Sequence, residues 1–292
     1  MFDIVKVNDK TYYLKNPSII GIYTPDSKNA YAIDTSGSDT SAKKLLEALD
    51  TLGLTLKAII NTHSHADHIG GNAYCQQQTG CKIYAPGLEY FLTNNPTFEP
   101  VYLFGGKPPK KLLHKLFAAK ASIAEPVTPD VLPEGLEMIP LPGHSFDETA
   151  YRTAEGVVFL GDALISEQTL NKYGITFNYD IAAEFETLDK LKTLEGTLFV
   201  PCHAEPTDDL SGLIEINRNG LKKVVNTILN IIKTPKTFDE VLSDAFNVFT
   251  IEINDAQFAL LGFTVRSYLV YLENEELAKH YFRDNKMYWE AI

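Results

Sequence analysis

The chain has 292 residues, 45% of them hydrophobic and 22% charged, so it can bury a full core and is not globally disordered. Its formal net charge of −12 disfavours a dedicated nucleic-acid binder, which needs clustered Lys and Arg to neutralise phosphates. The three cysteines, at positions 75, 81 and 202, lack metal-knuckle spacing and indicate free thiols in a reducing compartment. The first residues do not resemble a signal peptide and no apolar stretch reaches bilayer length, so we expect a cytoplasmic protein with no membrane partner.

Strands and one helix are predicted before the first histidines. Two hairpins are expected from apolar runs on either side of a polar turn, 4–7 with 11–14 and 19–23 with 30–33. A helix is predicted over 39–52, where leucines share one face and Gly53 ends the pattern. The apolar run 56–60 fits a buried strand that leads directly to His63, and a helix over 70–79 and a strand over 82–84 follow.

The remaining chain divides into three parts. Residues 88–121 are less regular and are interpreted as an insertion, after which strands are predicted at 137–140, 150–153, 157–160 and 198–201. Strands alternating with helices over residues 1–205 predict a layered α/β domain. Residues 206–292 predict a helical, winged-helix-like C-terminal region, with helices over 210–233, 238–245 and 255–272 and a hairpin of 280–282 with 287–289. Residues 205–292 hold 14 acidic and nine basic side chains, so we do not expect this region to bind DNA.

One basic stretch interrupts this acidic chain. Residues 101–124 contain no acid but carry His114 and five lysines, namely Lys107, Lys110, Lys111, Lys115 and Lys120. A solvated helix face beside a loop accounts for such a stretch, and a positive lid over an anionic substrate is the alternative. We expect the aromatic half of the insertion to wall a substrate pocket, with at least one lysine at its entrance; this half holds Tyr90, Phe91, Phe98, Tyr102, Leu103 and Phe104.

The metal-binding pattern begins at His63-Ser64-His65-Ala66-Asp67-His68, directly after an apolar strand. Imidazole nitrogen and carboxylate oxygen suit Zn²⁺, with Fe and Mn as the alternatives. Alternate residues of an extended segment share a face, so His63 and His65 can reach one ion together, whereas Asp67 and His68 fall where the chain turns. Four metal-binding side chains within six residues would contribute little to folding without a metal, so we predict a metal site here.

The cluster and four further motifs resemble those of the metallo-β-lactamase-fold hydrolases. The stretch from Thr62 to Gly71 is similar to the family signature, and Asp34 fits an early aspartate of the family. Three later motifs follow in the family's order, Leu141-Pro142-Gly143-His144-Ser145, Phe159-Leu160-Gly161-Asp162 and Pro201-Cys202-His203. Taken singly, Asp162 would be interpreted as a turn residue at the end of a strand, and His203 as a buried histidine with its hydrogen bonds made within the protein. Because both follow the histidine cluster in the family's order, they are interpreted as metal ligands. Cys202 is interpreted as strand-end packing, and His114 and His280 match no motif.

The resemblance covers about residues 1–205 and implies a four-layer αββα fold and a site for two divalent transition-metal ions. The first ion would be held by His63, His65 and His144, and the second by Asp67, His68 and His203. The carboxylate of Asp162 would bridge the two ions, and Asp67 and Asp162 are the candidate catalytic carboxylates. Asp34 would orient a ligand histidine by hydrogen bonding. The ions would share a hydroxide that attacks a carbonyl or phosphoryl group.

An aspartate at position 162 resembles the thioesterases of the glyoxalase II type, the lactonases and the phosphodiesterases, since the commonest β-lactamases have cysteine in that motif. We therefore expect hydrolysis of a small ester, thioester or lactone, anionic or neutral, by a monomer or a homo-oligomer. The glutathione-binding basic residues of glyoxalase II are not evident in the tail. Three alternatives stay open, namely a mononuclear iron oxygenase of the persulfide dioxygenase type, a phosphodiesterase or RNA-processing nuclease that uses the basic stretch, and a non-catalytic metal-binding module.

Overall fold

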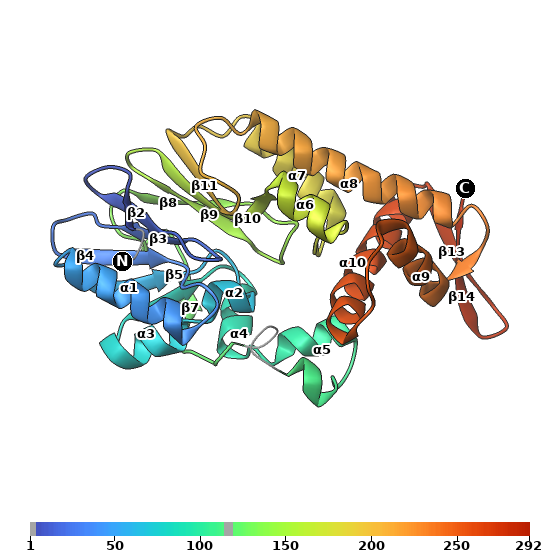
Figure 1. The fold of residues 1–292 in the computed structure, drawn as a ribbon, viewed down its shortest axis with the longest axis horizontal. Coiled ribbons are helices and arrows are strands. Elements are labelled where there is room, and N and C mark those ends of the chain that lie inside the picture. The colour runs from blue at the N-terminus through green and yellow to red at the C-terminus, as the bar shows by residue number, and fades with distance from the viewer. Residues whose placement is uncertain (1–3, 114–118) are drawn as a thin grey trace.

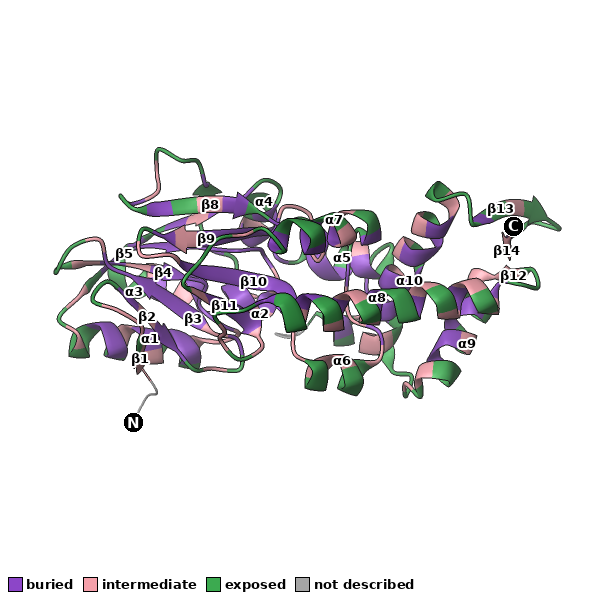
Figure 2. Cartoon of the chain, turned by 90° about the horizontal axis from the view of Figure 1, so that it is seen from above, coloured by how far each residue is buried: buried purple, intermediate pink, exposed green. Residues whose placement is uncertain are grey.

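The protein is described by a computed structural model that covers residues 4–113 and 119–292, so His114 and Lys115 lie outside the described residues. Two β-sheets pack face to face, helices cover their outer faces, and a mainly helical C-terminal region extends from one end (Figure 1). Buried residues concentrate in the strands of both sheets and on the inner faces of the helices (Figure 2). The chain is therefore a four-layer αββα structure with a helical extension, as its sequence predicted.

The first sheet has seven strands in sequential order, antiparallel as far as β4 and parallel from β4 onward. The strands are β1 (Ile4–Lys6), β2 (Thr11–Leu14), β3 (Ile20–Tyr23), β4 (Asn29–Ile33), β5 (Thr55–Ile60), β6 (Lys82–Ala85) and β7 (Glu125–Pro126). Helices α1 (Asp39–Thr51) and α3 (Asn72–Thr79) cover the outer face, where Leu45 and Leu49 share a core cluster with Ile20 and Ile59. The leucine face predicted over 39–52 is therefore the face that α1 buries.

The second sheet has four strands in the order β11-β10-β9-β8. They are β8 (Leu136–Pro140), β9 (Thr149–Thr153), β10 (Val157–Ile165) and β11 (Leu198–His203), and only β10 and β11 pair in parallel. Tyr23 and Ile60 of the first sheet share one core cluster with Tyr151 and Phe159 of the second. The sheets approach closely at Gly21, where an added Cβ would stand 2.6 Å from the Phe159 ring, so only glycine fits without a shift.

Short helices connect the strands around one end of the two sheets. They are α2 (Ala66–Ile69), α4 (Glu89–Asn94), α5 (Phe98–Phe104), the 3-10 turn η1 (Lys110–Leu112), α6 (Glu167–Tyr173) and α7 (Ile181–Leu191). The segment interpreted as irregular therefore forms two short helices, and the sequence did not reveal α6 or α7. Helix α7 packs on the outer face of the second sheet, where Ile181 and Leu188 are buried.

The C-terminal region follows the order helix, strand, two helices, hairpin. Its elements are α8 (Ser211–Ile231), β12 (Lys236–Thr237), α9 (Phe238–Phe249), α10 (Asp255–Asn274), β13 (Ala278–Arg283) and β14 (Lys286–Ala291). The strands form a small sheet in the order β12-β14-β13. One hydrophobic cluster runs from Val158 of the second sheet to Leu269 of α10, so this region shares a core with the sheet. The domain boundary near residue 205 stays a prediction. Within the described residues, no helix combines the length and the apolar character that crossing a bilayer requires.

Candidate metal centre

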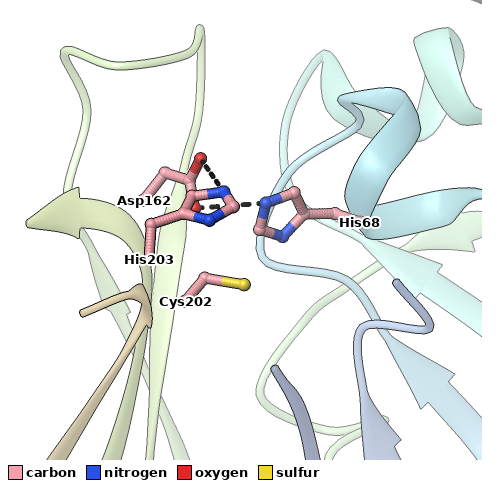
Figure 3. Close-up of side chains that lie close together, drawn as sticks. All are labelled: His68, Asp162, Cys202 and His203. Atoms are coloured by element: carbon pink, nitrogen blue, oxygen red, sulfur yellow. Dashed lines mark ion pairs between the residues drawn. The ribbon is translucent and has the colours of Figure 1, made fainter. Parts of the chain in front are cut away.

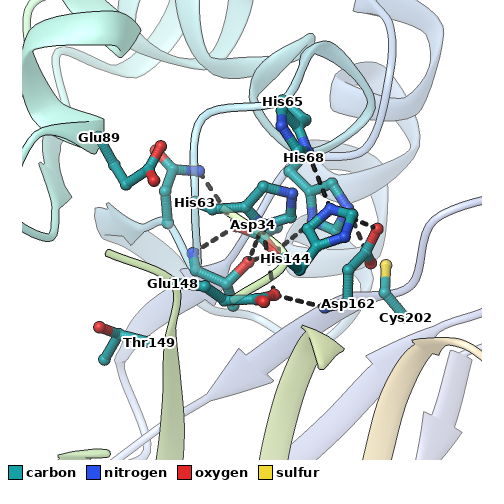
Figure 4. A network of polar contacts seen from close by, with 12 residues as sticks. Asp34, His63, His65, His68, Glu89, His144, Glu148, Thr149, Asp162 and Cys202 are labelled. Atoms are coloured by element: carbon teal, nitrogen blue, oxygen red, sulfur yellow. Dashed lines mark hydrogen bonds and ion pairs between the residues drawn. The ribbon is translucent and has the colours of Figure 1, made fainter. Parts of the chain in front are cut away.

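The histidines and aspartates picked out by the sequence converge at one edge of the two sheets. His63 follows β5 of the first sheet, and Asp162 and His203 lie on β10 and β11 of the second. The loop after β8 brings His144 to the same edge (Figure 4). Residues separated by up to 140 positions therefore meet where the parallel strands of each sheet end, which is where α/β sheets commonly bind ligands.

A first group consists of His63, His65 and His144, whose ligand-capable atoms all lie within 4.8 Å of one another. His144 Nε2 and His65 Nδ1 are 3.0 Å apart, and His63 Nε2 is buried without a hydrogen-bond partner. The second ring nitrogen is engaged in two cases, since His63 Nδ1 lies 3.0 Å from the Thr62 hydroxyl and His144 Nδ1 lies 3.1 Å from the Phe177 carbonyl. These contacts fix the ring orientations and leave lone pairs facing a common point.

A second group consists of His68, Asp162, Cys202 and His203 (Figure 3). Asp162 Oδ1 lies 3.1 Å from His68 Nε2, and Asp162 Oδ2 lies 3.2 Å from His203 Nε2. The same Oδ2 atom is 3.6 Å from His144 Nε2 of the first group. Asp162 is therefore the one carboxylate, among the described residues of the two groups, that reaches both.

Asp34 anchors the second group from behind. It lies at the end of β4 and accepts a hydrogen bond from His68 Nδ1 at 2.8 Å. It also accepts bonds from the Thr62 backbone at 2.8 Å, from the Thr62 hydroxyl at 2.7 Å and from the Asn61 amide at 3.3 Å. With Nδ1 held by Asp34, His68 directs Nε2 at Asp162, and a metal that displaced the Nε2 proton would find the lone pair already oriented.

Asp67 and Cys202 occupy positions that the sequence alone did not specify. Asp67 Oδ2 lies 3.2 Å from His203 Nε2 and 3.8 Å from His68 Nε2, and it accepts a bond from the Ser18 hydroxyl at 3.0 Å. Its half-exposed side chain stays outside the tighter second group, which Cys202 enters instead. The sulfur of Cys202 lies among the ligand-type atoms and 3.7 Å from the Ile19 carbonyl, and its role as strand-end packing stays a prediction.

The two groups differ in electrostatics. Asp162, only 3.2 Å away, raises the pKa of His203 to about 11. Burial works to lower the pKa of His68, but Asp162 and the other carboxylates around it raise that pKa well above its ordinary value. In the first group, burial lowers the pKa of His65 to about 3 and also lowers the pKa of His144. The carboxylates of the second group therefore attract positive charge, and the histidines of the first group stay in the neutral form that binds metals. Together, the side chains of the two groups suit divalent cations.

Two buried glutamates beside the site were not found from the sequence. Glu148 accepts a hydrogen bond from the Asp162 backbone at 2.6 Å and lies 3.6 Å from His63 Nδ1. It fits because Gly161 has a φ of +60° and no Cβ, which would stand 2.4 Å from the Glu148 carboxylate. Glu184, in the first turn of α7, accepts a bond from the His144 backbone, and burial raises its pKa to about 8. Their contacts are set by the fold and carry no local sequence signal.

A cavity of about 460 Å³ opens over the two groups. Five of the predicted ligands, His65, Asp67, His144, Asp162 and His203, lie on one side of it. Much of the remaining wall is apolar and comes from α6 and the segment after it, from α8 and from α10; it includes Leu170, Ile175, Leu221, Leu260 and Leu261, with Phe177 against the ligand histidines His65 and His144. The volume lies within the range of small-molecule sites, so the cavity can hold a substrate against the clustered donors.

The insertion does not form this wall, contrary to the sequence-based prediction. Among its described residues only Glu99 lines the cavity, whereas Tyr102 packs against Phe146 and Phe263. None of its described lysines lines the cavity either; Lys111 pairs with Asp255 and Lys120 with Asp39 on the surface. Tyr102 and Leu103 serve helix packing, because α5 lies against α10 (Figure 1), whereas Phe91, Phe98 and Phe104 are exposed. A lysine outside the insertion, Lys172 of α6, lines a neighbouring polar groove with Asp67 and His203.

The layered fold and the clustered donors at one sheet edge define an αββα protein with a candidate metal centre. Within that class, the family model of the metallo-beta-lactamase superfamily matches residues 22–203, and the chain belongs to this superfamily. All the ligand-type residues described above fall inside the matched segment.

Named relatives in this superfamily include hydroxyacylglutathione hydrolases. The chain is 32% identical over 184 residues to the protein of that name from Thiobacillus denitrificans, covering 62% of this chain and 59% of the relative. It is 29% identical over 186 residues to the one from Albidiferax ferrireducens, covering 62% of this chain and 60% of that protein. The chain thus spans about six tenths of the length of the curated relatives that it matches.

Solved structures extend the likeness to the whole chain. A beta-lactamase domain protein from Burkholderia ambifaria has a TM-score of 0.73 at 16% identity, covering 99% of this chain and 94% of that one. A metallo-beta-lactamase family protein from Thermus thermophilus has a TM-score of 0.68 at 19% identity, covering 100% of this chain and 98% of that one. These likenesses show that the fold, C-terminal region included, recurs in other proteins.

Proposed function

We propose that the protein is a dinuclear metal-dependent hydrolase that cleaves a small ester, thioester or lactone, with a thioester as the first candidate. The observation that carries the proposal is the pair of donor groups joined through Asp162 beside a substrate-sized cavity. The relatives named hydroxyacylglutathione hydrolase support thioester chemistry. An aspartate at position 162, where the commonest β-lactamases have cysteine, supports the same choice.

The proposed ligands follow the two groups. The first ion would be bound by His63, His65 and His144, and the second by His68, His203 and Asp67, with Asp162 shared by both. Burial raises the pKa of the Cys202 thiol, which favours Asp67 over Cys202 as the remaining donor. Two divalent ions, with Zn²⁺ as the first candidate and Fe or Mn as alternatives, would supply the Lewis acidity that activates water and polarises a carbonyl.

The protein's own groups would orient these ligands and the substrate. Asp34 and the Phe177 carbonyl each accept a ring proton, so the opposite nitrogens of His68 and His144 keep their lone pairs toward the cavity. The negative charge of Asp162, shared between the groups, would hold the two ions together. The apolar wall would exclude bulk water and place the scissile carbonyl against the donors.

The test combines metal analysis with turnover. Protein purified without chelator should contain up to two ions per chain after saturation, and it should release thiol from a panel of acyl thioesters. Chelation should abolish turnover, and restoring Zn²⁺, Fe²⁺ or Mn²⁺ should recover it. Binding of no more than one ion would refute the dinuclear site, and oxygen uptake with a persulfide substrate would favour the iron oxygenase. Cleavage of a phosphodiester or of RNA, with no thioester hydrolysis, would favour the nuclease.

A further inference from the structure

We infer that the cavity wall formed by α6, α8 and α10 is an acyl-binding arm that selects an uncharged, apolar acyl chain. This inference rests on the proposed hydrolase function and specifies its substrate. Three of the wall residues, Leu221, Leu260 and Leu261, follow residue 203, where the family match ends. The wall is therefore built in part by a segment that the family model does not describe.

The charges around the cavity argue against an anionic acyl group. No lysine or arginine lines the cavity in the described part of the chain. Apart from the proposed ligands and the phenol of Tyr173, its ionisable residues are two buried acids, Glu99 and Glu184. A carboxylate on the acyl chain would have to leave water beside these groups without a cationic partner, which costs free energy.

Two polar side chains of the wall, Asn217 and Asn178, are already engaged by the protein. The Asn217 amide donates to the carbonyls of Ile165 at 2.9 Å and Leu213 at 2.8 Å, and its oxygen accepts from the Ile165 backbone at 3.2 Å. Asn178 is hydrogen-bonded to the buried Tyr268. These groups hold α8 and α10 in place and have little capacity left to bind a polar acyl chain. The remaining surface offers chiefly apolar contact, which favours methylene groups.

A neighbouring groove beside the metal centre is more polar than the arm. It shares Asp67, His203, Thr169 and Tyr173 with the cavity and adds Gln168 and Lys172, which the cavity lacks. A thioester spanning the donors would place its acyl chain in the apolar arm, so this groove is left for the thiol leaving group. The arm and the groove thus fit a molecule with one apolar and one polar end.

The acyl preference can be measured with acetyl, butanoyl, hexanoyl, octanoyl and succinyl thioesters of one thiol. We expect kcat/KM to rise by about fourfold per added methylene until the arm is full, and the succinyl thioester to be the poorest substrate. Leu260→Trp, which narrows the arm, should lower the octanoyl-to-acetyl ratio of kcat/KM by at least tenfold. Val270→Trp is the matched control, because Val270 is an exposed residue of the same helix outside the cavity, and it should leave that ratio unchanged.

Binding to metal-depleted protein provides a second readout that does not depend on catalysis. Calorimetric titration should detect octanamide, a neutral and unreactive acyl analogue, and should not detect succinamate. Leu260→Trp should weaken octanamide binding by at least tenfold, and Val270→Trp should not. A preference for acetyl or succinyl thioesters, or unchanged octanamide binding in Leu260→Trp, would overturn the acyl inference while leaving the hydrolase proposal intact. If the protein bound octanamide but hydrolysed no thioester, the proposed thioester hydrolysis would be refuted and the acyl-binding arm would still be supported.

Discussion

Replacing Asp34 with asparagine should weaken one metal site and spare the other. Asp34 accepts four hydrogen bonds, one from His68 Nδ1 and the others from Thr62 and Asn61. Asparagine keeps one acceptor oxygen and turns an amide donor toward either His68 or Thr62. If the donor faces His68, the imidazole must move its proton to Nε2 to accept that bond, and it then loses the lone pair that faces Asp162. Either arrangement loses a charge-assisted bond.

The expected loss is 10- to 100-fold in the affinity of the His68 site, or about 1.4–2.7 kcal/mol, the usual effect of removing a carboxylate that orients a ligand histidine. Asparagine suits this test because position 34 has a φ of 61°, a left-handed conformation that asparagine tolerates better than alanine does. A folded variant therefore isolates the effect on the ligand from backbone strain.

The assay is a Zn²⁺ titration of metal-depleted protein against a chromophoric chelator, which resolves two binding steps. The step assigned to His63, His65 and His144 is the internal control, and it should change less, by about threefold at most, since Asp34 contacts none of these rings and reaches His63 only through the Thr62 hydroxyl. Circular dichroism of the metal-free variant checks that it is folded. Equal weakening of both steps, or none, would refute the assignment of Asp34 to one ligand.

Three further substitutions test other parts of the structure. Asp162→Asn removes the negative charge shared by the two groups of ligands. Elemental analysis should therefore show the loss of about one ion per chain, and thioester turnover should fall at least 100-fold. A variant that kept its metal content and its turnover would contradict the bridging role of Asp162. Glu184 has a pKa raised by burial from 4.5 to about 8, so the folded protein keeps a proton that the unfolded chain releases, and stability should fall as the pH rises through that window. In urea denaturation of metal-free protein, Glu184→Gln should remove up to about 1.4 kcal/mol per pH unit of that slope, and an unchanged slope would refute the shift. Gly70→Ala would place a Cβ 2.3 Å from the Gly37 carbonyl carbon, so it should cost about 2–3 kcal/mol in unfolding free energy. Gly212→Ala, whose Cβ would meet nothing within 4 Å, is the control, and equal stability of the two variants would contradict the packing.

Local patterns predicted the elements and the ligand-type residues well. The cluster from His63 to His68 is contiguous, and the motifs of His144, Asp162 and His203 lie on or soon after strands that periodicity can locate. The helices and strands were placed for the same reason, since a buried face repeats along one segment. Short helices such as α6 and α7 were missed because strands and loops flank them and their apolar stripes are brief.

Properties that depend on which segments meet could not be predicted. Glu148 and Glu184 lie beside the site only because the second sheet and α7 bring them there. The aromatic residues of the insertion were assigned to the pocket, but Tyr102 found a partner in Phe263, more than 150 residues away. Most aromatic residues of the insertion are instead exposed, among them Phe91, Phe98 and Phe104, because composition does not specify which of them meets a partner.

The division of the site between two parts of the chain has a consequence for how its properties vary. All the proposed ligands lie between residues 63 and 203, on strands β10 and β11, on the short helix α2 and on loops beside the two facing sheets. The apolar wall also draws on residues 217–261, from helices that share a core with the second sheet. Substitutions in α8 or α10 can therefore reshape the acyl arm without moving a ligand, whereas the ligand geometry is fixed by buried contacts such as that of Asp34 with His68. Substrate choice can change in this fold while the metal chemistry is retained, because different segments specify the two.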